Sequence, residues 1–92
     1  MSQKRIEGHV TGRVQGVGFR FFVQSTAEQS RLGGYVRNCN DGRVEIVAEG
    51  EESNLIDFIE RVKQGPPMAH VTGFDVKWKE NLERLSDFRI TH

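Results

Sequence analysis

The spacing of apolar residues in this sequence switches repeatedly between two and about 3.6 residues, and the order of these switches limits the fold more than any other feature. A spacing of two predicts strands at residues 5–12, 35–39, 43–49, 71–79 and 87–91. Helical spacing predicts helices at residues 19–31 and 52–64. This order is typical of the split β-α-β arrangement. We therefore expect an α+β, ferredoxin-like βαββαβ sandwich, in which an antiparallel sheet carries two helices on one face.

The same patterns predict which side chains enter the core. The residues that alternate with the apolar ones in the third strand include Glu45 and Glu49, and we expect both carboxylates to be solvated. Phe58 and Trp78 are expected to be core residues. Between the second and third strands, Asp41-Gly42 predicts a tight hairpin turn with positive φ angles.

Length and charge exclude several classes of protein. The chain has 92 residues, so we expect residues 1–92 to form a single domain. It has thirteen basic and thirteen acidic residues and a net charge of zero. Proteins that bind nucleic acids or membrane surfaces generally carry a basic excess, so we expect neither partner. Residues 1–46 have seven basic and four acidic side chains, so any anion site should lie in this half.

Cysteine, histidine and apolar runs exclude further classes. The single cysteine, Cys39, allows no internal disulfide, and we interpret it as a buried small apolar group rather than a nucleophile. His9, His70 and His92 share no ligand spacing, so we expect no metal site. No apolar run exceeds three residues, and the first ten residues lack the apolar core of a signal peptide. We expect a cytoplasmic protein that acts as a monomer.

The candidate for chemistry is the loop at residues 13–18, between the first strand and the first helix. Its two glycines allow the backbone to turn so that successive N–H groups converge. The helix that follows has unpaired N–H groups and a partial positive charge at its start. Arg20 adds a side chain that can hold two phosphate oxygens at once. Together these features predict a site for a tetrahedral anion, although a lone Gly-x-Gly is more often a simple tight turn.

Longer motifs favour the functional interpretation of this loop. The run Gly12-Arg13-Val14-Gln15-Gly16-Val17-Gly18-Phe19-Arg20 resembles the signature of the acylphosphatase family. Gly34-Tyr35-Val36-Arg37-Asn38, followed by Asp41-Gly42-Arg43-Val44-Glu45, resembles that family's second motif. Gly65-Pro66-Pro67 with Ala69 and Val71 fits a later pattern. The resemblance covers roughly residues 8–90. One departure is Ser30-Arg31-Leu32, where many members have Leu-Gly-Leu, with the glycine ending the first helix.

The resemblance implies an enzyme that hydrolyses the carboxyl–phosphate bond of acyl phosphates, without a metal or other cofactor. It implies that Arg20 and Asn38 are catalytic. The phosphate-binding loop that it implies comprises Gln15, Gly16, Val17, Gly18, Phe19 and Arg20. Asn38 would position the attacking water, and Arg20 would bind the phosphate together with the loop amides. Inorganic phosphate or sulfate would then bind as product or inhibitor.

The residue types agree with this chemistry, because phosphoryl transfer depends on positioning and charge stabilisation more than on covalent help. Asn38 offers a donor and an acceptor and does not titrate, so it can orient a water molecule, although asparagine is also common before turns. RNA recognition would need exposed aromatic residues on the central strands, and a metallochaperone would need Cys-x-x-Cys; neither pattern is present. A non-catalytic anion-binding regulatory module of the same fold remains as the alternative.

Overall fold

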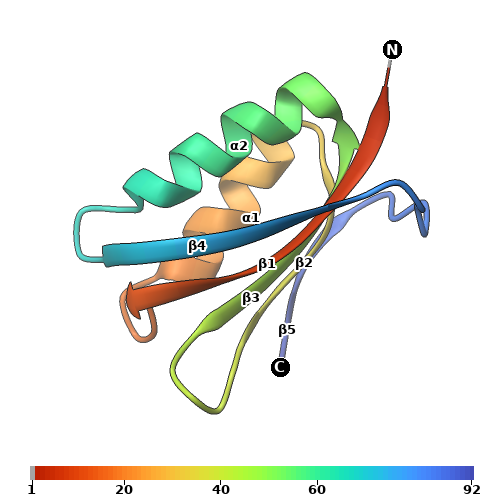
Figure 1. Cartoon of the computed structure of the whole chain (residues 1–92). Coiled ribbons are helices and arrows are strands. Elements are labelled where there is room, and N and C mark those ends of the chain that lie inside the picture. Colours follow the sequence, from red (N-terminus) through yellow and green to blue (C-terminus); the bar gives the residue numbers. More distant parts are fainter. Residues whose placement is uncertain (1) are drawn as a thin grey trace.

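The computed structural model describes residues 2–92, and its elements follow the predicted order (Figure 1). The strands and helices are β1 (Gln3–Arg13), α1 (Phe19–Gln29), β2 (Gly33–Asn38), β3 (Val44–Glu51), α2 (Glu52–Gln64), β4 (His70–Lys79) and β5 (Phe88–Thr91). Both helices lie on the same face of the twisted sheet (Figure 1). The expected α+β sandwich is confirmed.

The sheet has the strand order β4-β1-β3-β2-β5, and one of its pairings differs from the expectation. β1 is antiparallel to β3 and β4, and β2 is antiparallel to β3. β5, however, runs parallel to β2, with Gly34 opposite Phe88 and Arg37 opposite Thr91. The reason is the route of residues 80–87, which cross from one edge of the sheet to the other at the end where β2 begins. The sheet is therefore mixed rather than wholly antiparallel.

The core lies between the helices and the sheet. Its largest fully buried side chains include Ile6, Val10, Phe19, Val23, Val36, Ile46, Leu55 and Phe58. The prediction for Phe58 is confirmed, but that for Trp78 is wrong, since Trp78 is 44% exposed. Trp78 lies on β4, which is an edge strand. A side chain on an edge strand has neighbouring strand residues on one side only, so its inward face is less completely covered.

The β2–β3 hairpin has the expected turn with a different distribution of φ angles. The Gly42 N–H donates to the Cys39 carbonyl at 3.2 Å, and the Cys39 N–H donates to the Arg43 carbonyl at 2.8 Å. Positive φ occurs at Gly42 (95°) but not at Asp41, which corrects the prediction. The Asp41 carboxylate accepts from the Arg43 N–H (3.1 Å) and from Arg43 Nε (2.9 Å). These contacts lower the pKa of Asp41, and the backbone hydrogen bond contributes most.

Helix α1 ends at Gln29, two residues earlier than predicted, and an arginine follows its cap residue at the position where glycine is usual. The Leu32 N–H donates to the Ala27 carbonyl (2.9 Å), and the Arg31 N–H donates to the Glu28 carbonyl (3.1 Å). This pair of bonds is the Schellman motif, which needs a left-handed residue after the helix cap. Arg31 occupies that position with φ of 57°. The expected glycine conformation is thus present without the glycine.

Glu49 corrects a second prediction, because its side chain is buried instead of solvated. Only 5% of the residue is exposed, and its carboxylate accepts a 2.6 Å hydrogen bond from Arg5 Nη1. It also accepts from the backbone N–H groups of Glu83 (2.7 Å) and Leu85 (3.0 Å). Burial alone would raise the pKa of Glu49, but the donors outweigh it and lower that pKa. Glu49 therefore anchors the crossing segment that leads into β5.

Candidate active site

The ends of β1, β2 and β5 meet at one end of the sheet, and a shallow hollow lies between them. Figure 1 shows the loop after β1 and the β2–β3 hairpin at this same end. The hollow has a volume of about 190 Å³. It is lined by Val14, Gly16, Gly18, Phe19, Arg20, Phe21, Asn38 and Ile90. The structure thus brings Arg20 and Asn38 to one cavity, together with the loop before α1.

The backbone of this loop has the shape that an anion site needs. Gly16 has φ of 75°, and Gly18 has φ of 76° with ψ of 17°. Both values lie in the left-handed region, where side chains other than glycine are strained. Space is not the constraint, because nothing lies within 4 Å of a β-carbon placed on either residue. Left-handed residues in a short loop turn successive N–H groups toward one side, which is the geometry of an anion-binding nest.

The start of α1 adds positive potential that nothing nearby neutralises. The first helical hydrogen bond runs from the Phe22 N–H to the Gly18 carbonyl, at 3.0 Å. The N–H groups of Phe19 and Arg20 therefore have no acceptor within the helix. Gly18 at the cap has no side chain to accept from them, and the first turn contains no acidic residue. This helix end can therefore hold an anion.

Arg20 is half-buried in the first turn of α1, and its side chain lines the hollow. Its Nη1 lies 3.3 Å from Nδ1 of His92. Within residues 2–92, no carboxylate forms an ion pair with Arg20. Its charge is therefore not neutralised by a carboxylate, and of its donors only Nη1 has a protein contact, with His92.

Asn38 is the last residue of β2, and it lines the same hollow as Arg20. Its Oδ1 is buried and has no hydrogen-bond partner in the described chain. Leaving such an acceptor unpaired costs about 1–3 kcal/mol. No hydrogen bond to Oδ1 within the described chain therefore holds the Asn38 side chain in place.

The side chain of Gln15 connects the loop to the hairpin. Its Nε2 donates to the carbonyl of Cys39 at 2.8 Å and to the carbonyl of Arg43 at 2.9 Å. Of the predicted loop residues, Gln15 and Val17 are not among those that line the hollow, and the side chain of Gln15 instead attaches the loop to the hairpin. Cys39 itself is half-buried in the turn and is a free thiol.

Three neighbours of the hollow were not predicted as site residues: Phe21, Ile90 and His92. Phe21 and Ile90 line the hollow, and His92 contacts Arg20. Ile90 and His92 reach this place because β5 is parallel to β2 at the sheet edge. The sequence carries no local signal for that pairing. Of these three residues, only Phe21 could have been noticed in the sequence, as an aromatic residue directly after Arg20.

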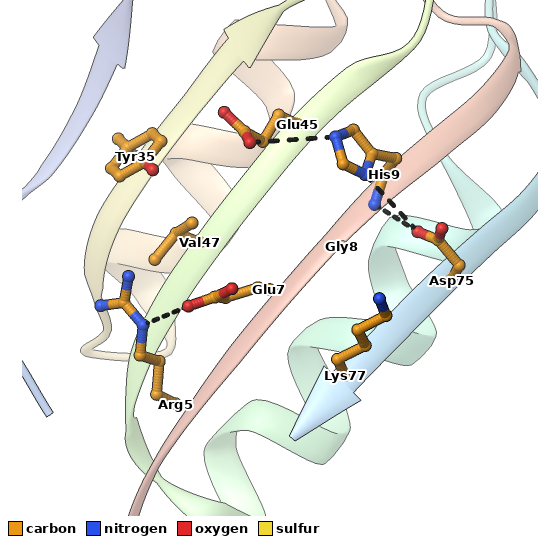
Figure 2. A pocket seen from close by; sticks show the side chains of 9 residues that line it. All are labelled: Arg5, Glu7, Gly8, His9, Tyr35, Glu45, Val47, Asp75 and Lys77. Carbon is orange, nitrogen blue, oxygen red and sulfur yellow. Dashed lines mark hydrogen bonds and ion pairs between the residues drawn. The ribbon is translucent and has the colours of Figure 1, made fainter. Parts of the chain in front are cut away.

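The sheet face without helices has a second hollow, of about 180 Å³ (Figure 2). Most of the charged groups around it are paired with one another. Arg5 donates from Nε to Glu7 at 2.8 Å, and this hydrogen bond lowers the pKa of Glu7.

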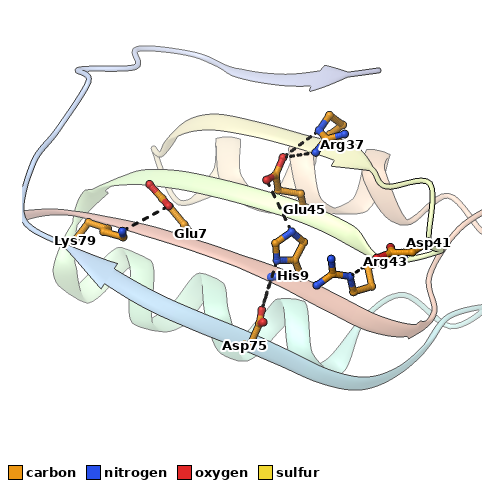
Figure 3. A network of polar contacts seen from close by, with 8 residues as sticks. All are labelled: Glu7, His9, Arg37, Asp41, Arg43, Glu45, Asp75 and Lys79. Carbon is orange, nitrogen blue, oxygen red and sulfur yellow. Dashed lines mark hydrogen bonds and ion pairs between the residues drawn. The ribbon is translucent and has the colours of Figure 1, made fainter.

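A polar network continues along this face (Figure 3). Glu45 lies between Arg37, whose Nη2 is 2.9 Å from Oε1, and His9, whose Nε2 is 3.8 Å from Oε2. Nδ1 of His9 is 4.0 Å from Asp75. Glu45 is thus paired and half-buried, contrary to the expectation of a solvated carboxylate. These contacts join four neighbouring strands, β4, β1, β3 and β2, and none of these residues lines the hollow at Arg20.

Two structural findings concern other kinds of site. Among residues 2–92, no group of three or more His, Cys, Asp or Glu side chains is arranged to hold a metal ion. No helix in that same range is long and apolar enough to cross a membrane.

The fold is an α+β sandwich with a hollow beside a glycine loop and a helix start, and comparisons with known proteins specify the family. The family model "Acylphosphatase" matches residues 6–90. The chain is 51% identical to an acylphosphatase of Bacillus subtilis, over 90% of this chain and 91% of that protein. The chain belongs to the acylphosphatase family, and it is accordingly a hydrolase with acylphosphatase activity.

Solved structures agree with this assignment. The crystal structure of acylphosphatase from Bacillus subtilis matches with a TM-score of 0.95 and 47% identity, over 97% of this chain and 99% of that one. A structure of full-length HypF in a phosphate- and nucleotide-bound form matches with a TM-score of 0.90 and 33% identity. That match covers 99% of this chain but 12% of the HypF chain. The same fold therefore also occurs as a small part of a longer protein.

Proposed function

We propose that the hollow is the active site, in which Arg20 and the amides of residues 15–20 hold the phosphoryl group and Asn38 positions the attacking water. The observation that carries this proposal is the hollow that Asn38 and Arg20 line together, in which the guanidinium of Arg20 contacts His92 but pairs with no carboxylate of residues 2–92. A water molecule that donates a hydrogen bond to the side-chain amide of Asn38 would have its own lone pair free for phosphorus.

Phosphate binding in this proposal uses two kinds of donor. The glycine loop and the start of α1 supply N–H groups and general positive potential. Arg20 supplies a planar pair of donors that matches two phosphate oxygens. This division of labour agrees with the needs of phosphoryl transfer, in which negative charge on the equatorial oxygens must be tolerated as water approaches.

The reaction needs no protein group that changes its protonation state. Water attacks phosphorus, the bond between phosphorus and the acyl oxygen breaks, and the electron pair leaves with the carboxylate. Because a neutral asparagine is not a strong base, a phosphate oxygen of the substrate accepts the proton from the water. The products are a carboxylate and inorganic phosphate. No covalent phosphoenzyme, metal or cofactor takes part.

The ligands and the setting follow from the same site. Inorganic phosphate and sulfate have the shape and charge of the bound phosphoryl group, so they should compete with substrate. They should also raise the melting temperature, because a ligand that binds only the folded state stabilises it. We further propose that the chain acts as a single domain, as a monomer, and in the cytoplasm.

The test is the release of phosphate from benzoyl phosphate, with a phosphate monoester as the control. We expect hydrolysis of the acyl phosphate alone, with full activity in EDTA. Activity that is lost in EDTA and restored by added metal would contradict the metal-free mechanism. Tight phosphate binding without turnover would instead support the alternative, a regulatory anion-binding module.

A further inference from the structure

Phe21 is exposed in a place where its exposure calls for an explanation. It belongs to the first turn of α1, next to Arg20, and 71% of it is accessible. The described chain has three other large exposed apolar side chains, Ile56, Met68 and Trp78. None of these three lines the hollow, whereas Phe21 does. The most exposed aromatic side chain thus lies at the edge of the candidate active site.

The lining of the hollow has a polar part and an apolar part. The polar part consists of the glycine loop, Arg20 and Asn38. In the apolar part, Val14 and Phe19 are each 1% exposed and have almost no surface left for a ligand. Phe21 and Ile90 still have accessible surface. A ligand that is anchored in the polar part can therefore reach apolar surface only on these two side chains.

An acyl phosphate likewise has a polar end and an end that can be apolar. Its phosphoryl end is charged, and its acyl end projects away from the phosphate oxygens that the polar part of the hollow would bind. We propose that Phe21, together with Ile90, forms an acyl-group subsite, which makes the enzyme favour acyl phosphates with an aromatic or extended apolar acyl group over short ones such as acetyl phosphate. This inference rests on the proposed function of the hollow.

The effect of the subsite should appear in substrate binding. Phe21 touches the part of the substrate that does not react, so its contact is equally strong in the ground state and in the transition state. Such uniform binding lowers KM and leaves kcat nearly unchanged. A contact between an aromatic ring and an aromatic acyl group is expected to change kcat/KM by about tenfold.

The experiment measures kcat and KM for benzoyl phosphate and acetyl phosphate in the wild type, Phe21→Ala and Phe21→Trp. The matched control is Ile56→Ala, which shortens another exposed apolar side chain on a helix, outside the hollow. Phe21 is exposed and alanine is a better helix former, so Phe21→Ala should fold, and circular dichroism checks this. The deciding quantity is the ratio of kcat/KM for benzoyl phosphate to kcat/KM for acetyl phosphate.

We expect Phe21→Ala to lower this ratio about tenfold, mainly through the KM for benzoyl phosphate. Phe21→Trp should keep or raise the ratio, and Ile56→Ala should leave it at the wild-type value. An unchanged ratio in Phe21→Ala, or an equal loss for both substrates, would overturn the subsite. If the wild type hydrolyses neither compound, the proposed function fails first, and the subsite fails with it.

Discussion

The side-chain amide of Gln15 donates a 2.8 Å hydrogen bond to the carbonyl of Cys39, the residue directly after Asn38. One side chain thereby joins the loop that would bind phosphate to the strand end that would position water. The distance between the two halves of the candidate site therefore depends on a contact between residues 24 positions apart.

The first prediction concerns this contact. Gln15→Ala removes two donors and should lower both kcat and stability, because the carbonyls of Cys39 and Arg43 lose hydrogen bonds worth about 1 kcal/mol each. Gln15→Glu should be worse than Gln15→Ala near neutral pH, since a carboxylate would face two carbonyl oxygens. Urea unfolding and kcat on an acyl phosphate measure the two effects. A Gln15→Glu variant as active and stable as wild type would show that the contact is incidental.

The second prediction separates the chemical role of Asn38 from any structural one. Asn38→Ala should lower kcat by about 100- to 1,000-fold, the scale for removing one preorganised group that acts on the transition state. Its stability should stay within about 1 kcal/mol of wild type or rise, because the variant loses a buried acceptor that has no protein partner. The control is Asn40→Ala, in the exposed turn two residues later. A kcat of Asn38→Ala close to that of the wild type would show that Asn38 has no role in the reaction and is an ordinary residue before a turn.

The third prediction tests whether direction or charge matters at Arg20. Arg20→Lys keeps the charge but loses the planar fork. Because the loop and the start of α1 already supply positive potential, Arg20→Lys should be nearly as damaging as Arg20→Ala in kcat/KM. Arg13→Ala, which removes a nearby exposed charge, should have little effect when all variants are compared at one ionic strength. If lysine restored most of the activity, the site would work by charge alone.

The fourth prediction is a stabilising substitution. Arg31 has φ of 57° in the Schellman motif that ends α1. A left-handed conformation costs a residue other than glycine about 1 kcal/mol, so Arg31→Gly should stabilise the protein by roughly 0.5–1 kcal/mol. Ser30→Gly is the control, because Ser30 has φ of −90° and glycine there gains nothing. Chemical denaturation measures the free energy of unfolding of both variants and the wild type. Equal values for Arg31→Gly and the wild type would contradict the prediction.

The fifth prediction concerns acid. The pKa of Glu49 is below its ordinary value, because donors from Glu83, Leu85 and Arg5 outweigh the opposing effect of burial. A carboxylate with a depressed pKa stabilises the folded state above its unfolded pKa and loses that contribution as the pH falls through its folded pKa. Stability should therefore decline from about pH 5 downward.

The matched variant for this pH effect is Glu49→Gln. It should be less stable than wild type at pH 7 by about 1–3 kcal/mol, since it removes the buried charge that accepts from Arg5 Nη1 and leaves Glu7 as the nearest carboxylate of Arg5. Its decline in acid should be shallower, although Glu7 and Asp41, whose pKa values are also lowered, keep part of the slope. Denaturation measured from about pH 3 to about pH 7, the range in which carboxylates titrate, gives the free energy of unfolding of both proteins as a function of pH. Parallel curves would exclude Glu49 as the group responsible.

The local pattern of residues was enough to predict most elements of the fold. Apolar residues recur every two positions in a strand and about every 3.6 positions in a helix when one face is buried. Either spacing can be recognised within a short stretch of sequence. The loop before α1 and Arg20 were recognised as a candidate anion site because glycine spacing and residue type are also local properties, whereas the catalytic roles of Arg20 and Asn38 were predicted from the resemblance to the family. Their convergence on one hollow agrees with the resemblance to a family, which contains information about the tertiary structure.

The remaining features depend on contacts between distant segments, which no local pattern contains. Glu49 and Glu45 occupy outward positions of β3, but Glu49 is buried because residues 80–87 cross over it and donate backbone hydrogen bonds to it. Trp78 has an inward position on β4, yet the edge of the sheet leaves it exposed. The parallel pairing of β5 brings Ile90 and His92 to Arg20. Alternation along a strand determines the face on which a side chain lies, whereas the packing of the whole chain determines what covers that face.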